Sequence, residues 1–247
     1  MTTYDAKFFD YVNSGAARSA ERVLPHLLQH LTISSVLDVG CGQGAWLSVW
    51  KKLGVNDIMG IDGDYVSQAS LLISPDWFKS ADLAHGFTLG RRFDLVQCLE
   101  VAEHLPLSSS AILVDSLVEH GDIVLFSAAP KGQGGDHHIN EQDYEFWRRQ
   151  FARHGYAPFD FLRPLLLGDD QIEPWYRYNP FLYVSPMRID KLPVAISCCR
   201  VPDKEKLRDL SPLPYQIRKW AVSFLPAAVM TQLAKIKESC VSWARRD

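Results

Sequence analysis

Along this chain, stretches with apolar residues at helical spacing alternate with short, continuous apolar runs. Residues 16–31 place apolar residues at helical spacing, and residues 35–39 follow as a short apolar run that ends in glycines. The alternation continues downstream. It predicts helices over residues 45–53, 109–119 and 143–154, and strands over residues 57–61, 93–99, 122–128, 159–162 and 180–184, with one more strand ahead of residue 81. Strands that alternate with helices indicate βαβ units around a parallel sheet, with ligands beyond the strands' carboxyl ends.

This pattern divides the chain into three parts. Residues 1–33 are predicted to form a helical cap, residues 34–201 the α/β domain, and residues 202–247 a basic helical tail. The tail repeats apolar residues on one face of two amphipathic segments, at Ile217, Trp220, Ala221, Phe224 and Leu225 and at Val229, Leu233, Ile236 and Cys240. We expect the tail to pack on the domain, to mediate a homodimer or to contact a membrane surface.

Composition narrows the class of protein. The chain has 247 residues, of which 47% are hydrophobic and 22% charged, which excludes collagen-like, coiled-coil and largely disordered proteins. The net charge of −3 gives no reason to expect a nucleic-acid partner. Five cysteines without a C-x-x-C pair indicate reduced thiols. Since no signal peptide and no run of about 18 apolar residues is found, we predict a cytoplasmic protein without a transmembrane segment.

A glycine cluster, DVGCGQG at residues 38–44, directly follows the first predicted strand. Glycines let the backbone turn tightly and approach a ligand, and the following helix start offers unpaired N–H groups. Alone, the cluster is ambiguous, because Gly40, Gly42 and Ala45 also fit the G-x-G-x-x-A pattern of dinucleotide-binding proteins. Asp62, after the next strand, suits the ribose hydroxyls of a nicotinamide cofactor and of S-adenosylmethionine equally.

Motifs further along the chain resolve this ambiguity. ADL at residues 81–83 and FDLVQCLEVAEHL at residues 93–105 follow VLDVGCGQG and GID in order. Together they resemble the class I S-adenosylmethionine-dependent methyltransferases over residues 34–130. The resemblance implies an α/β fold with a Rossmann-like seven-stranded sheet, an N-terminal helical cap, a C-terminal helical appendage, and S-adenosylmethionine as the cofactor.

The resemblance also implies which residues bind the cofactor. They are Arg18, Asp38, Gly40, Gly42, Asp62, Asp82, Leu83, Leu99 and Glu100. Asp38 and the Gly40 backbone would hold the methionine end, Asp62 the ribose, and Asp82 with Leu83 the adenine. The carbonyl near residues 99–100 would receive the methionine ammonium, and the predicted cap helix would offer an arginine to the cofactor carboxylate.

Carboxylates and imidazoles cluster in two stretches. Glu100, Glu103 and His104 would share one face if a helix began there. Residues 136–141, DHHINE, follow the fifth strand, and in the fold that the resemblance implies they overhang the same crevice. These groups could bind Mg²⁺ or Mn²⁺ through Glu100, Glu103, His104 and His138. The set resembles the metal site of small-RNA 2′-O-methyltransferases, and its E-x-x-E-H part resembles that of ubiquinone-pathway O-methyltransferases.

Two other interpretations of these residues stay open. His138, His137 or His104 could be a general base, because the ordinary pKa of histidine suits proton removal near neutral pH. Alternatively, the glutamates brace the cofactor and the loop, while residues 140–141 cap the helix predicted from residue 143.

The acceptor is predicted from aromatic residues. Trp147 and Phe151 are predicted to lie in the core, whereas Trp175, Tyr176 and Tyr178 belong to a candidate lid. Aromatic faces with carboxylates suit a sugar or a glycosylated product. We therefore predict O-methylation of a sugar, nucleotide-sugar or natural-product hydroxyl. The alternatives are an RNA 2′-O-methyltransferase, which the acidic body disfavours, and a non-catalytic interaction module.

Overall fold

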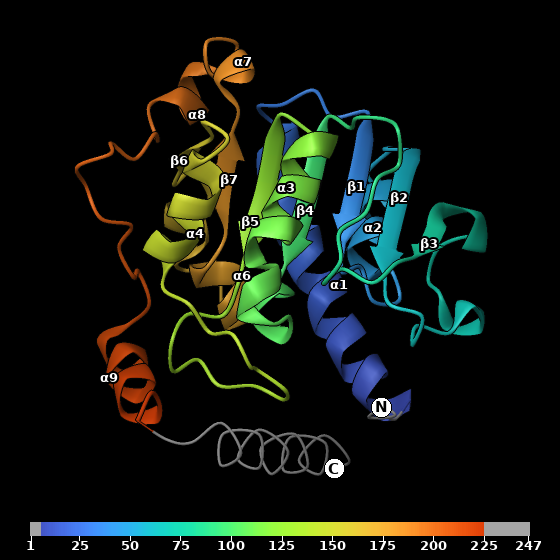
Figure 1. Ribbon diagram of the computed structural model, residues 1–247, viewed down its shortest axis with the longest axis horizontal. Coiled ribbons are helices and arrows are strands. Elements are labelled where there is room, and N and C mark those ends of the chain that lie inside the picture. Colours follow the sequence, from blue (N-terminus) through green and yellow to red (C-terminus); the bar gives the residue numbers. More distant parts are fainter. Residues whose placement is uncertain (1–5, 225–247) are drawn as a thin grey trace.

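The computed structural model describes residues 6–224, with side chains from residue 13 onward. Its centre is a seven-stranded sheet in the order β3-β2-β1-β4-β5-β7-β6. The strands are β1 (Ser35–Val39), β2 (Asp57–Asp62), β3 (Phe78–Ser80), β4 (Leu95–Leu99), β5 (Ile123–Ser127), β6 (Ala157–Phe159) and β7 (Phe181–Val184). The first five are parallel, and β7 is antiparallel to both neighbours (Figure 1). The predicted seven-stranded α/β fold is confirmed.

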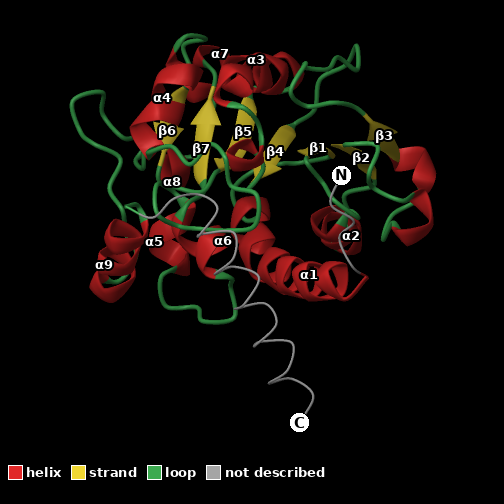
Figure 2. Cartoon of the chain, turned by 60° about the horizontal axis from the view of Figure 1, so that its bottom comes forward, coloured by secondary structure: helices red, strands yellow, loops and turns green. Residues whose placement is uncertain are grey.

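Helices cover both faces of the sheet. They are α1 (Ala6–Leu28), α2 (Ala45–Lys52), α3 (Ser110–His120), α4 (Tyr144–Ala152), α5 (Leu162–Leu166), α6 (Pro174–Tyr178), α7 (Pro186–Ile189), α8 (Val194–Ser197) and α9 (Leu213–Val222). Figure 2 shows α1, α2, α5 and α6 on one face and α3 and α4 on the other. Each face has its own apolar cluster. The predicted core residues Trp147 and Phe151 are buried in the second cluster, and Phe151 stacks on Tyr183.

The helical spacing over residues 16–31 belongs to α1, which begins earlier, at Ala6. Two local expectations from the sequence are wrong. The run predicted as a strand over residues 159–162 ends its strand at Phe159, and Leu162 begins α5. A short apolar run fits a strand and a buried helix equally well, so its spacing could not separate them. The cap of α4 is Asp143, whose carboxylate accepts the Phe146 N–H at 3.1 Å, rather than residues 140–141.

The segment between β7 and α9 is tied to the domain by two buried arginines. Arg148 donates to the carbonyl oxygens of Val201, Pro202 and Glu205. Arg163 donates to the carbonyl of Arg208 at 2.8 Å. Buried guanidinium groups need such partners, so these carbonyls fix the path of the chain toward α9. The tail residues predicted beyond Phe224 lie outside the described residues.

No helix within residues 6–224 is both long enough and apolar enough to cross a membrane.

Candidate active site

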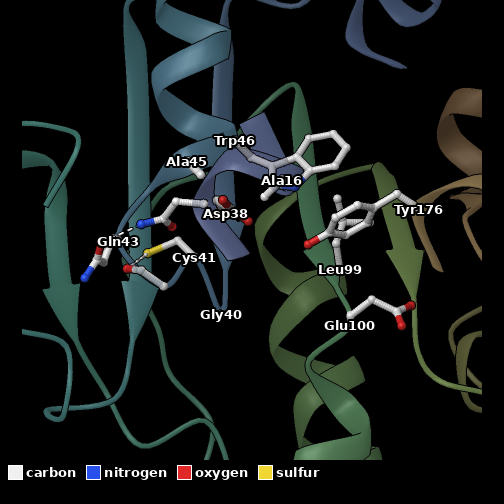
Figure 3. A pocket seen from close by; sticks show the side chains of 12 residues that line it. Ala16, Asp38, Gly40, Cys41, Gln43, Ala45, Trp46, Leu99, Glu100 and Tyr176 are labelled. Atoms are coloured by element: carbon white, nitrogen blue, oxygen red, sulfur yellow. Dashed lines mark hydrogen bonds between the residues drawn. The ribbon is translucent and has the colours of Figure 1, made fainter. Parts of the chain in front are cut away.

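A pocket of about 150 Å³ opens at the carboxyl ends of β1 and β4. Figure 3 shows Asp38 of β1, Leu99 of β4 and Tyr176 of α6 converging on it. Five of the predicted cofactor residues line this pocket: Asp38, Gly40, Gly42, Leu99 and Glu100. The carboxyl end of a parallel sheet is where such folds bind ligands, so the pocket lies where the topology predicts it.

The glycine turn after β1 forms the floor of the pocket. Gly40 has a φ of +77°, and a Cβ there would lie 2.3 Å from Val101 Cγ2, so both its conformation and its packing require glycine. Gly42 has a φ of +52°, but a Cβ there would meet no atom within 4 Å. The protein leaves open space at Gly42, which is what the backbone needs to approach a ligand.

The two carboxylates beside this turn are buried. Burial, with a smaller contribution from the nearby charge of Asp62, raises the pKa of Asp38 to about 7. Asp62 accepts hydrogen bonds from the backbone N–H groups of Gly42 at 2.6 Å and Gly63 at 2.7 Å. It also accepts the hydroxyl of Tyr65. Since both carboxylates are desolvated, a cation bound in the pocket would favour their ionised forms.

Three further predicted cofactor residues lie away from the pocket lining. Asp82 follows β3 and is exposed, with its carboxylate accepting the Ala84 N–H at 2.9 Å, whereas Leu83 beside it is buried. Arg18 on α1 donates to the Glu173 carboxylate at 2.7 Å and so joins α1 to the segment before α6. The candidate lid segment is thereby joined to α1, and its Tyr176 lines the pocket.

Glu100 does not share a helix face with Glu103 and His104. Its φ is +57°, in the left-handed region, so no helix begins there, and a short 3-10 turn forms only at Ala102–His104. The Glu100 carboxylate instead accepts hydrogen bonds from Gln133 Nε2 at 2.7 Å and Asn179 Nδ2 at 3.1 Å. The predicted arrangement is wrong because backbone geometry turns Glu100 toward the pocket.

The sequence motifs did not indicate Gln133 or Asn179 as site residues. Gln133 lies in the glycine-rich loop after β5 and Asn179 follows α6, and their amides bond to each other at 2.8 Å as well as to Glu100. The one signal for Gln133 was its position among glycines. Nothing in the sequence pattern distinguished Asn179.

Glu103, His104 and His138 bring their ligand atoms within 4.8 Å of one another. Glu103 is fully buried, and neither of its oxygens has a hydrogen-bond partner among residues 6–224. Burial and the neighbouring Glu100 charge raise the pKa of Glu103 well above its usual range. Burial lowers the pKa of His104 to about 4. The cluster therefore offers one carboxyl and two imidazoles that suit a divalent cation.

His138 is held in place by its own loop. Its Nδ1 lies 2.8 Å from Glu141 Oε1, and both side chains are buried. A Cβ at Gly135 would lie 2.2 Å from His138 Nε2, so only glycine leaves room for the ring. His137 lies outside this cluster. It has a φ of +56°, and its side chain is partly exposed beside Asp136.

A family model described as a methyltransferase domain matches residues 11–155, more than half of the chain. The chain belongs to this methyltransferase family. Its fold is that of the class I S-adenosylmethionine-dependent methyltransferases, as the sequence motifs predicted. The nicotinamide alternative is thereby set aside.

Relatives of the methyltransferase differ in substrate. A ubiquinone biosynthesis O-methyltransferase from Shewanella pealeana is 33% identical over 100 residues, covering 37% of this chain and 42% of that protein. A tRNA U34 carboxymethyltransferase from Ectopseudomonas mendocina is 29% identical over 135 residues, covering 50% and 41%. The chain thus spans about two fifths of the length of the curated relatives it matches.

A solved sugar N-methyltransferase from Streptoalloteichus shares the fold, with a TM-score of 0.56 and 19% identity. The alignment covers 75% of this methyltransferase and 96% of that chain. At this identity the likeness extends to the fold alone.

Proposed function

We propose that this methyltransferase moves a methyl group from S-adenosylmethionine to a hydroxyl of a small acceptor, namely a sugar, nucleotide sugar or natural product. The observation that carries the proposal is Glu100, which lines the glycine-floored pocket and accepts a hydrogen bond from Gln133, in the loop that also holds His138. Glu100 thus joins the glycine turn to a loop with a group able to take a proton. Methyl transfer needs those two elements side by side.

Different pocket residues bind different parts of the cofactor. Asp38 and the Gly40 backbone hold the methionine end, and the carbonyls near Leu99 and Glu100 receive its ammonium. A cationic ligand here matches the carboxylates of Asp38 and Glu100, whose pKa values are raised by desolvation. Since burial disfavours their charge in the empty pocket, cation binding and ionisation would reinforce each other.

The remaining cofactor contacts follow from the neighbouring strands. Asp62 would exchange the Tyr65 hydroxyl for the ribose hydroxyls, while Asp82 and Leu83 flank the adenine beyond β3. Arg18 is already paired with Glu173, so its role in this proposal is to hold α1 beside the pocket wall. A cofactor carboxylate would compete with that ion pair.

His138 is the general base of the proposed reaction. Glu141 occupies its Nδ1, which leaves Nε2 to take the acceptor proton. As the acceptor oxygen bonds to the methyl carbon, the carbon–sulfur bond breaks and S-adenosylhomocysteine leaves. The hydroxyl proton passes to His138. His104 packs edge-on against this ring, with 4.9 Å between the ring centroids. His137 adjoins His138 along the backbone.

Glu103, His104 and His138 also fit a Mg²⁺ or Mn²⁺ ion, because the buried Glu103 oxygens have no partner among the described residues. A bound divalent ion would lower the pKa of an acceptor hydroxyl and suit vicinal hydroxyls. Glu100 is turned away toward two amides, so it is left out of this ligand set. In the metal-bound form His138 would be a ligand rather than the base.

The proposal is tested in two steps. Calorimetric titration with S-adenosylhomocysteine should show saturable one-to-one binding, weakened in Asp62→Asn and unchanged in the neighbouring exposed Asp64→Asn. Methyl-labelled cofactor is then offered with paired hydroxy and amino sugars. Label in the hydroxy sugar, with or without a requirement for Mg²⁺, supports the proposal. Label in the amino sugar alone, or a folded protein that binds no cofactor, overturns it.

A further inference from the structure

Helix α9 has an inner side that packs on the loop after β5. The Lys219 ammonium is buried and bonded to Asp209. Arg218 donates to the carbonyl oxygen of Gln133 at 3.0 Å, and a Cβ at Gly132 would lie 1.8 Å from the Lys219 carbonyl oxygen. These contacts fix which side of α9 faces the protein.

The opposite side of α9 is an apolar stripe. With 3.6 residues per turn, its three positions within the helix and Phe224 just past it fall within an arc of about 60°. The exposed fractions are 68% for Leu213, 55% for Ile217, 67% for Trp220 and 70% for Phe224. The Trp220 and Phe224 rings meet edge to face at 5.1 Å. Contiguous exposed apolar surface of this kind marks an interaction site. Figure 1 shows α9 at the margin of the molecule, away from the sheet.

Charge is unevenly distributed along the sequence. Residues 204–247 contain nine Lys or Arg and four Asp or Glu, a net +5, while residues 1–203 carry −8. Lys204, Lys206 and Arg208 are exposed on the segment that leads to α9. An apolar stripe with tryptophan and phenylalanine, flanked by basic residues, has the character of a helix that lies in a lipid interface.

We propose that the outer face of α9 docks on the surface of an anionic lipid bilayer. The stripe enters the headgroup region, and Lys204, Lys206 and Arg208 meet the lipid phosphates. The same anionic surface repels residues 1–203, which carry a net charge of −8. The protein would therefore approach the bilayer with α9 rather than with its acidic part. A symmetric dimer through the stripe would bring together two copies of residues 204–224, each with five Lys or Arg and two Asp or Glu, a net +3, which disfavours a second copy as occupant. Because the inner side of α9 contacts residues 132–133, the bilayer would lie beside the proposed acceptor loop.

The test is co-sedimentation of the full chain with vesicles of phosphatidylcholine, with or without phosphatidylglycerol. The wild-type protein should bind the anionic vesicles and release them as salt is raised. The double variant Ile217→Ser with Trp220→Ser should lose at least about tenfold in partitioning, because it removes half of the stripe. A matched control changes the exposed Met187 and Val194 on α7 and α8 to serine and should bind normally.

Three results would overturn the proposal. The wild-type chain could fail to bind anionic vesicles, or the stripe variant could bind them as well as the control does. Alternatively, light scattering could show a dimer that the stripe variant dissolves while vesicle binding is absent. Cofactor binding by calorimetry, measured on each variant, separates these results from misfolding and from failure of the proposed methyl transfer.

Discussion

One carboxylate, that of Glu141, fixes both the loop after β5 and the ring of His138. Its Oε1 lies 2.8 Å from His138 Nδ1 and 2.7 Å from the backbone nitrogen of Gly134. Its Oε2 accepts the N–H of Gly132 at 2.8 Å. A buried carboxylate in this position orients the imidazole and stabilises the protonated ring that a general base becomes. Glu141 is therefore a positioning residue for His138.

We predict that Glu141→Gln lowers turnover by about 10- to 100-fold, the range seen when a partner that orients an active histidine is lost. Affinity for S-adenosylhomocysteine should stay unchanged, because Glu141 does not line the pocket. Single-turnover kinetics and calorimetry measure the two quantities. Glu119→Gln, on an exposed carboxylate bonded to Thr88, is the matched control. An equal loss of turnover and cofactor affinity would assign Glu141 to the general stability of the loop.

A second prediction concerns the carboxyl of Glu103, whose oxygens have no hydrogen-bond partner among residues 6–224. In the presence of EDTA, Glu103→Gln should change the free energy of unfolding by less than about 1 kcal/mol, because a neutral carboxyl and an amide bury similar polar groups. Added Mn²⁺ should raise the Tm of the wild-type protein and leave the variant unaffected. Thermal unfolding with and without the ion measures both effects. If the ion stabilises the two proteins equally, the cluster is not its site.

The fold could be predicted because its signals are local. The strands β1, β2, β4 and β5 come from short apolar runs, and the glycine turn follows from residues adjacent in sequence. The active-site contacts depend on long-range placement instead. Glu100 meets Asn179 across 79 residues, and the pairing of Arg18 with Glu173 spans 155. The left-handed backbone at Glu100 is equally invisible to spacing rules, which assumed a helix there.

The contact between Gly132 and α9 carries a third prediction. Gly132 has a φ of +80°, and a Cβ there would press on the Lys219 carbonyl, so Gly132→Ala must displace α9. We expect a loss of about 2–4 kcal/mol in the free energy of unfolding, combining backbone strain with the clash. Trp220 fluorescence should change with it. Gly90→Ala is the control, because Gly90 has a φ of +66° in open space and suffers the strain alone. Equal losses in the two variants would mean that α9 moves aside without cost.

The fourth prediction is a pH dependence of stability that originates at Asp38. Its folded pKa of about 7 lies above the usual 3.8, so between these values the folded protein holds a proton that the unfolded chain has released. The stabilisation from this proton is complete when the pH is below the unfolded pKa. It falls by up to about 1.4 kcal/mol per pH unit between the two pKa values and is lost above the folded pKa. Asp38→Asn removes it. Urea unfolding at about pH 5 and about pH 8 measures this effect. From the lower to the higher pH, the free energy of unfolding of the variant should rise by about 2–3 kcal/mol relative to that of the wild-type protein. Parallel pH profiles would mean that Asp38 is charged throughout and is neutralised by a cation in the pocket.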